Sequence, residues 1–128
     1  MSMHPSFQTE TEFELPKGYV DDGGTLHRQG VMRLATAADE ILPMRDPRVQ
    51  ENEAYLPIIV LSRVITRLGS LRDINPGVIE GLYSADLGFL EELYSQFNAR
   101  GETADALDFS AKANGGQSLH RIAAMGEA

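Results

Sequence analysis

The chain has 128 residues and a formal net charge of -8 at pH 7, and its length fits one domain with a modest core. Nucleic-acid-binding proteins draw most of their affinity from Lys and Arg that neutralise phosphates, so we expect no nucleic-acid partner for an acidic chain. Cysteine is absent, which excludes disulfides, thiolate metal sites and a cysteine nucleophile and suits a cytoplasmic protein.

The start of the chain, residues 1–12, is predicted to be a flexible arm. It is polar, with Phe7 as its one sizeable apolar side chain after the first methionines, and it lacks the basic start and apolar run of a signal peptide. The longest apolar run, residues 56–61, is far shorter than the ~20 residues of a membrane-spanning helix. We therefore expect a soluble protein with no membrane partner.

The first predicted element is a β-hairpin over residues 13–34. Phe13 and Leu15 alternate with polar residues, which is typical of a strand with one buried face. Residues 16–18 are interpreted as a turn within this stretch. The sequence Asp21-Asp22-Gly23-Gly24 then supplies residues that tolerate a tight reversal, after which the chain returns as a second strand.

A short helix is predicted after the hairpin, with a loop behind it. Thr36 can cap this helix, and Asp39 three residues later completes a short variant of the capping box. Residues 44–51 contain Asp46-Pro47, and a residue before proline is pushed toward extended geometry. This stretch is predicted to be a connecting loop.

A longer helix is predicted from Asn52 to Gly69. Its apolar residues recur at three- and four-residue steps, and Arg63 and Arg67 share another face of it. The β-branched run at 58–60 equally fits a buried strand. The length of the periodic stretch favours the helix.

The pair Asn75-Pro76 predicts a further helix, because it combines a capping side chain with proline at the first helical position. Ser84 is interpreted as a helix cap that starts, together with Asp86, another turn. Either one bent helix or two in tandem then ends at Gly101.

These elements predict an α+β fold. The hairpin is expected to pack on a small bundle of three to four helices in a single domain over residues 13–100. Residues 101–128 have few large apolar side chains, so they are predicted to form a flexible or partly helical tail.

No catalytic or ligand-binding motif is present in the sequence. The glycine pairs at 23–24 and 115–116 lack the lysine and hydroxyl residue that complete a phosphate-binding loop. His4, His27 and His120 lie far apart and have no histidine at ligand spacing. We expect no catalytic residues, no cofactor and no metal site.

A partner-binding site is predicted instead from a strand end and a pair of arginines. Val31, Met32 and Leu34 fall at the end of the second strand, whose outer edge is expected to be open to a strand from another chain. Arg63 and Arg67, one helical turn apart, could meet a partner that carries carboxylates.

A competing hypothesis gives the two arginines an internal role. They would pair with the protein's own Glu91 or Glu92 and hold helices together, and such exposed pairs are common and individually weak.

Several stretches between Phe13 and Phe97 carry a family resemblance. They are Leu-Pro-Lys-Gly-Tyr-Val (15–20), Thr-Leu-His-Arg-Gln-Gly-Val-Met-Arg-Leu-Ala-Thr-Ala-Ala-Asp-Glu-Ile (25–41), Asp-Pro-Arg-Val (46–49), Tyr-Leu (55–56), Arg-Val-Ile-Thr-Arg-Leu-Gly (63–69) and Asp-Leu-Gly-Phe-Leu-Glu-Glu-Leu-Tyr (86–94). Over about two-thirds of the chain, the sequence resembles small phage tail assembly proteins. These occur with contractile-tailed phages and related contractile injection systems, and they are similar to tail assembly chaperones.

The resemblance implies a non-enzymatic role in cytoplasmic virion assembly through protein–protein interaction. The expected partners are tail tube, baseplate or tape-measure proteins, and the chain would act as a chaperone or as a minor component of the particle. Two other hypotheses stay open: an unrelated adaptor or regulatory domain, and a small hydrolase or lyase whose carboxylates and His27 converge only in the fold. The oligomeric state is also left open.

Overall fold

The computed structural model describes residues 8–99. Of the two predicted flanks, residues 1–7 and 101–128 lie outside the described part. The elements in chain order are β1 (Glu10–Val20), β2 (Leu26–Arg33), α1 (Ala37–Ile41), the 3-10 helix η1 (Leu42–Arg45), α2 (Pro47–Glu51), the 3-10 helix η2 (Glu53–Tyr55), α3 (Leu56–Val64), β3 (Ile65–Leu68), α4 (Pro76–Glu80) and α5 (Ser84–Phe97).

The predicted hairpin is confirmed as β1 and β2, which pair antiparallel. Its turn is held by Asp21, whose carboxylate accepts the backbone N–H groups of Gly23 and Thr25, each at 2.9 Å. Strand β1 already begins at Glu10, inside the stretch predicted to be an arm. The turn predicted at 16–18 is instead part of this strand, where the register with β2 shifts.

The sheet contains a third strand that the sequence analysis did not predict. Its order is β1-β2-β3, so β2 is central and its outer edge is paired with β3. The expectation of an open edge on the second hairpin strand was therefore wrong. The helix predicted up to Gly69 ends at Val64, and residues 65–68 form β3.

After the hairpin, the first helix begins as predicted, but the segment that follows it is helical where a loop was predicted. The Thr36 capping box is confirmed, with the Asp39 side chain bonded to the Thr36 backbone. The predicted loop at 44–51 is wrong, because the carboxylate of Asp46 caps α2, which has Pro47 at its first position.

The last two helices confirm the tandem arrangement. Asn75 caps α4, with its side-chain oxygen accepting the N–H of Val78. Tyr83, not Ser84, occupies the cap position of α5 and makes no side-chain capping bond. No helix in residues 8–99 is long and apolar enough to cross a membrane.

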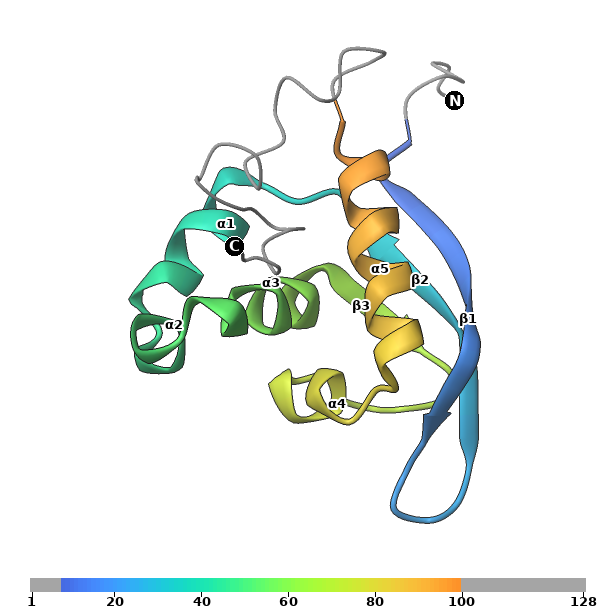
Figure 1. The fold of residues 1–128 in the computed structure, drawn as a ribbon. Helices are drawn as coiled ribbons and strands as arrows, with labels where there is room; N and C mark the ends of the chain where they lie inside the picture. Colours follow the sequence, from blue (N-terminus) through green and yellow to red (C-terminus); the bar gives the residue numbers. More distant parts are fainter. Residues whose placement is uncertain (1–7, 100–128) are drawn as a thin grey trace.

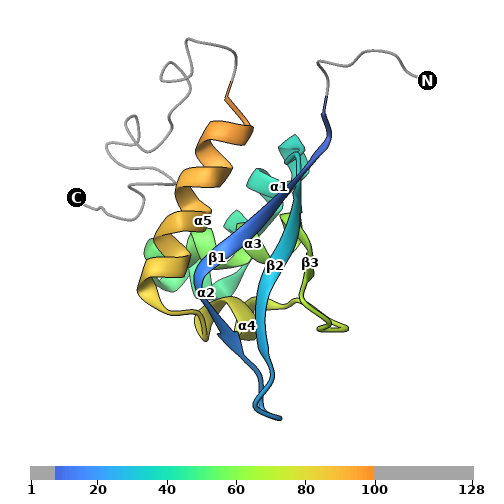
Figure 2. The same ribbon diagram turned by 90° about the vertical axis from the view of Figure 1, so that its right-hand side faces the viewer.

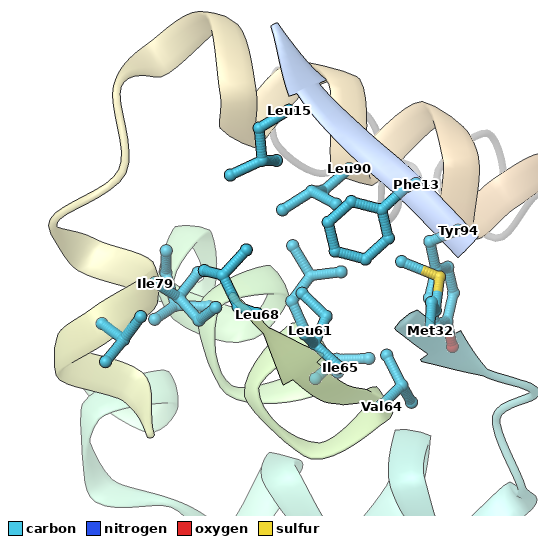
Figure 3. Close-up of a cluster of buried hydrophobic side chains, with 13 residues drawn as sticks. Phe13, Leu15, Met32, Leu61, Val64, Ile65, Leu68, Ile79, Leu90 and Tyr94 are labelled. Atoms are coloured by element: carbon cyan, nitrogen blue, oxygen red, sulfur yellow. The ribbon is translucent and has the colours of Figure 1, made fainter. Parts of the chain in front are cut away.

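The fold is α+β, as predicted, with the helices gathered on one face of the sheet (Figures 1 and 2). The core lies between them and is shown in Figure 3, where Phe13 and Leu15 from β1 meet Leu90 from α5. The ring of Phe13 also packs edge-on against Phe89. The opposite face of the sheet is left uncovered by the described helices (Figure 2).

Candidate protein-binding surface

The sheet separates two rows of side chains that point in opposite directions. Residues paired across neighbouring strands point to the same face, and the next residue along each strand points to the other. Phe13, Gly30 and Leu68 form one row, and all three are buried. The adjacent row must therefore face away from the core.

That second row consists of Glu12, Val31 and Arg67, one residue from each strand. Glu12 and Arg67 are exposed, and Val31 is half-buried. Glu10 and Glu14 are also exposed and lie on the same face as Glu12, because they are two residues away on β1. We call the surface formed by these five residues the outer face.

Charge is unevenly distributed on the outer face. Within residues 8–99, no ion pair or side-chain hydrogen bond engages Glu12 or Arg67. Glu14 makes a 3.5 Å ion pair with Arg28, and both side chains are largely exposed. The carboxylates thus lie on β1, with the guanidinium two strands away.

The predicted site residues do not form one surface. Val31 and Arg67 lie side by side on the outer face. Met32 is fully buried in the core at 0% exposure, so a partner cannot reach it on the folded protein. Leu34 is half-buried beyond the end of β2, where its N–H donates to Thr9.

Arg63 and Arg67 are not one helical turn apart. Arg63 belongs to α3 and Arg67 to β3. The Nε of Arg63 donates to Asp39 at 2.9 Å. Its internal role is therefore to hold α1 against α3, through Asp39 instead of the expected Glu91 or Glu92.

Asp39 is a polar centre that the sequence analysis recognised only as part of a cap. It is 2% exposed, and its oxygens accept from Arg33 at 2.7 and 3.0 Å as well as from Arg63 and Thr36. The Arg33 guanidinium is the main reason why the pKa of Asp39 lies well below its usual range. The same pairing raises the pKa of Arg33.

His27 is buried, and both of its ring nitrogens are used. Its Nε2 lies 2.8 Å from Asp21, and its Nδ1 accepts the N–H of Ser70 at 3.2 Å. An accepting Nδ1 places the proton on Nε2, which then donates to Asp21. Gly69, at φ +58°, lets the chain pass over this ring. The arrangement favours a structural role, because no ring nitrogen is free for a substrate.

Asp86 joins the start of α5 to β1. It is 0% exposed, and its two carboxylate oxygens accept the N–H groups of Lys17 and Gly18 at 2.8 and 2.9 Å. These donors lie where the register of β1 shifts, so Asp86 satisfies backbone groups that the ladder leaves unpaired. Its sequence signal, an acidic residue in the first helical turn, is too common to identify this contact.

The buried polar groups therefore serve the fold. In the part of the chain that the structure describes, no group of three His, Asp or Glu side chains could hold a metal ion. No family model matches the chain, and neither a curated protein nor a solved structure matches it.

Proposed function

We propose that this chain is a non-enzymatic protein-binding factor in the assembly of a contractile phage tail or a phage-derived contractile injection particle. It acts there as a tail assembly chaperone or as a minor tail or baseplate component in the cytoplasm. The identification of the tail rests on the sequence resemblance between Phe13 and Phe97, which lies within the described residues.

The observation that carries a binding role is the use of the buried ionisable groups. Among the described residues, the buried side chains that can ionise are those of His27, Asp39, Asp86 and Tyr94, and the hydroxyl of Tyr94 donates to Glu40. Each has its polar atoms engaged by other groups of the same chain. A catalytic group must be able to reach its substrate. Because the polar atoms of these buried groups are already engaged, the arrangement supports a protein that functions through binding at its surface.

The surface suits contacts with assembling subunits. Tail subunits that have not yet polymerised expose strand edges and apolar loops that would aggregate, and a binding protein can cover them. This chain offers a sheet face that the described helices leave uncovered (Figure 2), and the exposed residues of that face include Glu12 and Arg67. Its net charge of -8 accelerates encounters with basic partners.

Affinity purification from the native cell tests the proposal. The native protein carries an affinity tag, and the captured proteins are quantified by mass spectrometry against an untagged strain. We expect enrichment of a tail tube, baseplate or tape-measure protein. Enrichment of proteins unrelated to tails, with no tail component among them, would support the adaptor hypothesis and contradict this one.

A further inference from the structure

We infer that the outer face docks a partner protein of opposite charge pattern, basic where it meets Glu10, Glu12 and Glu14 and acidic where it meets Arg67, with Val31 at the centre of the contact. The inference rests on the proposed function, because it names the chemistry of the partner that the assembly factor binds.

The outer face is open because the fold uses only the other side of the sheet. The row of Phe13, Gly30 and Leu68 faces the helices and is buried, so the neighbouring row faces outward. Gly30 makes this close packing possible, since a Cβ atom there would lie 2.3 Å from the Phe13 ring. In Figure 2 the three strands lie in front of the helices.

On the outer face, the carboxylates lie on β1 and the guanidinium of Arg67 lies on β3, so opposite charges are not on neighbouring strands. Opposite charges on neighbouring strands stabilise a sheet, and like charges close together destabilise it. Glu12 has Val31 as its cross-strand neighbour. Glu10 is paired with Arg33, but that guanidinium is bound to Asp39. The acidic strand therefore lacks full compensation from within the described chain.

Arg67 completes the pattern at the other side of the face. It lies in register with Val31 and Glu12, about 10 Å from Glu12 across two strand spacings. A partner with Lys or Arg opposite β1 and Asp or Glu opposite Arg67 would satisfy both sides at once. The half-buried Val31 side chain lies between them and offers an apolar contact.

A second copy of this chain is a poor occupant. The outer face carries three carboxylates, at Glu10, Glu12 and Glu14, and the guanidinium of Arg67, and the Arg28 guanidinium pairs with Glu14 beside it. Each copy has a formal net charge of -8, so two copies repel one another, which opposes association. We therefore assign the face to a different protein.

A photo-cross-linker tests which protein covers the face. Benzoylphenylalanine replaces Val31 in the full chain in the native cell, and a matched strain carries it at the exposed Arg72, outside the sheet. We expect the Val31 position alone to give an adduct with a tail protein, attached near Lys or Arg residues of that protein.

Charge reversal tests the chemistry of the contact. In the Val31 cross-linking strain, Glu12→Lys combined with Arg67→Glu should reduce the adduct at least about tenfold, because both ends of the contact then repel the partner. The control combines Glu51→Lys with Arg72→Glu, which makes the same changes at exposed positions elsewhere, and the adduct should persist. Opposite substitutions at the cross-linked residues of the partner should restore the adduct.

An adduct that survives the Glu12 and Arg67 reversal, or one formed with a second copy of the chain, overturns the inference. The inference also fails if position 31 gives no adduct while a tail protein still co-purifies with the chain, and the proposed function then stands. If no tail protein co-purifies at all, the proposed function fails with it.

Discussion

At the scale of the residue, Asp39 shows how one buried charge connects separate parts of the chain. Its carboxylate receives Arg33 from β2 and Arg63 from α3 while it caps α1. A neighbouring contact, from Tyr94 of α5 to Glu40 of α1, ties the last helix to the same place. Burial is the main reason why the pKa of Tyr94 is raised, and the Glu40 carboxylate adds to this. These contacts hold α1 against β2, α3 and α5.

Replacing Asp39 with Asn should lower the free energy of unfolding by about 2–3 kcal/mol. The substitution removes the charge and leaves two guanidinium groups without their counter-ion. The loss stays below that of a fully buried ion pair because both arginine side chains are about one-third exposed. Urea denaturation measures it. Asp46→Asn is the control, since Asn can still cap α2 and the pair with Arg48 lies at the surface; it should change stability little. Equal losses for the two variants would contradict the role given to Asp39.

The stabilisation by Asp39 should depend on pH in the acid range. Its pKa is lowered in the folded protein, so the unfolded state binds the proton more readily. The stabilisation is fully present above the usual carboxyl pKa of about 3.9 and is lost as pH falls through the folded value. The difference in stability between the native chain and Asp39→Asn should therefore be constant from pH 7 to about pH 5 and shrink below about pH 4. Denaturation at several pH values measures this, and a difference that grows toward acid would contradict it.

At the scale of the element, the features that could be predicted from the sequence are those that depend on residues close together in the chain. The hairpin turn, the Thr36 cap and the Asn75-Pro76 helix start all depend on residues close together in the chain, and the structure confirms each of them. Strand β3 was missed because Val64 and Leu68 are four residues apart, which suits a helix, while pairing with β2 depends on residues far away in sequence.

The missed strand also explains why the site was only partly predictable. With β3 absent, the edge of β2 looked open and Arg67 was placed on a helix with Arg63. The alternation of Glu12 and Glu14 with Phe13 and Leu15 is visible in the sequence, and it marks one exposed face of β1. Their relation to Arg67 depends on the sheet order, which no local pattern contains.

Two glycines should respond to alanine in opposite ways because their elements differ. At Gly30, a Cβ would lie 2.3 Å from the Phe13 ring and 2.7 Å from the carbonyl oxygen of Arg67, so Gly30→Ala should cost about 1–3 kcal/mol. At Gly88 in α5, a Cβ meets nothing within 4 Å, and Gly88→Ala should stabilise by about 0.5–1 kcal/mol through helix propensity. Thermal melts compare the two variants. A stabilised Gly30→Ala would mean that the Phe13 ring and the β3 backbone lie less closely against Gly30 than described.

At the scale of the whole molecule, the helices cover one face of the sheet and leave the other face uncovered (Figure 2). Buried Asp39, Asp86 and His27 connect the helices, the sheet and the loop after β3. The outer face carries charges that these internal contacts leave largely unused. This division supports the proposal of a binding protein and leads us to expect that surface substitutions on the outer face change assembly without changing stability.

The number of intact contractile tails per cell, counted by negative-stain electron microscopy, tests the central claim most directly. The gene is removed from the native cell and then restored as the native chain or as the Glu12→Lys and Arg67→Glu variant. We predict that removal abolishes intact tails and leaves tube or sheath protein unassembled, and that the native chain restores them. Normal numbers of intact tails in the absence of the chain would contradict the proposed role in assembly.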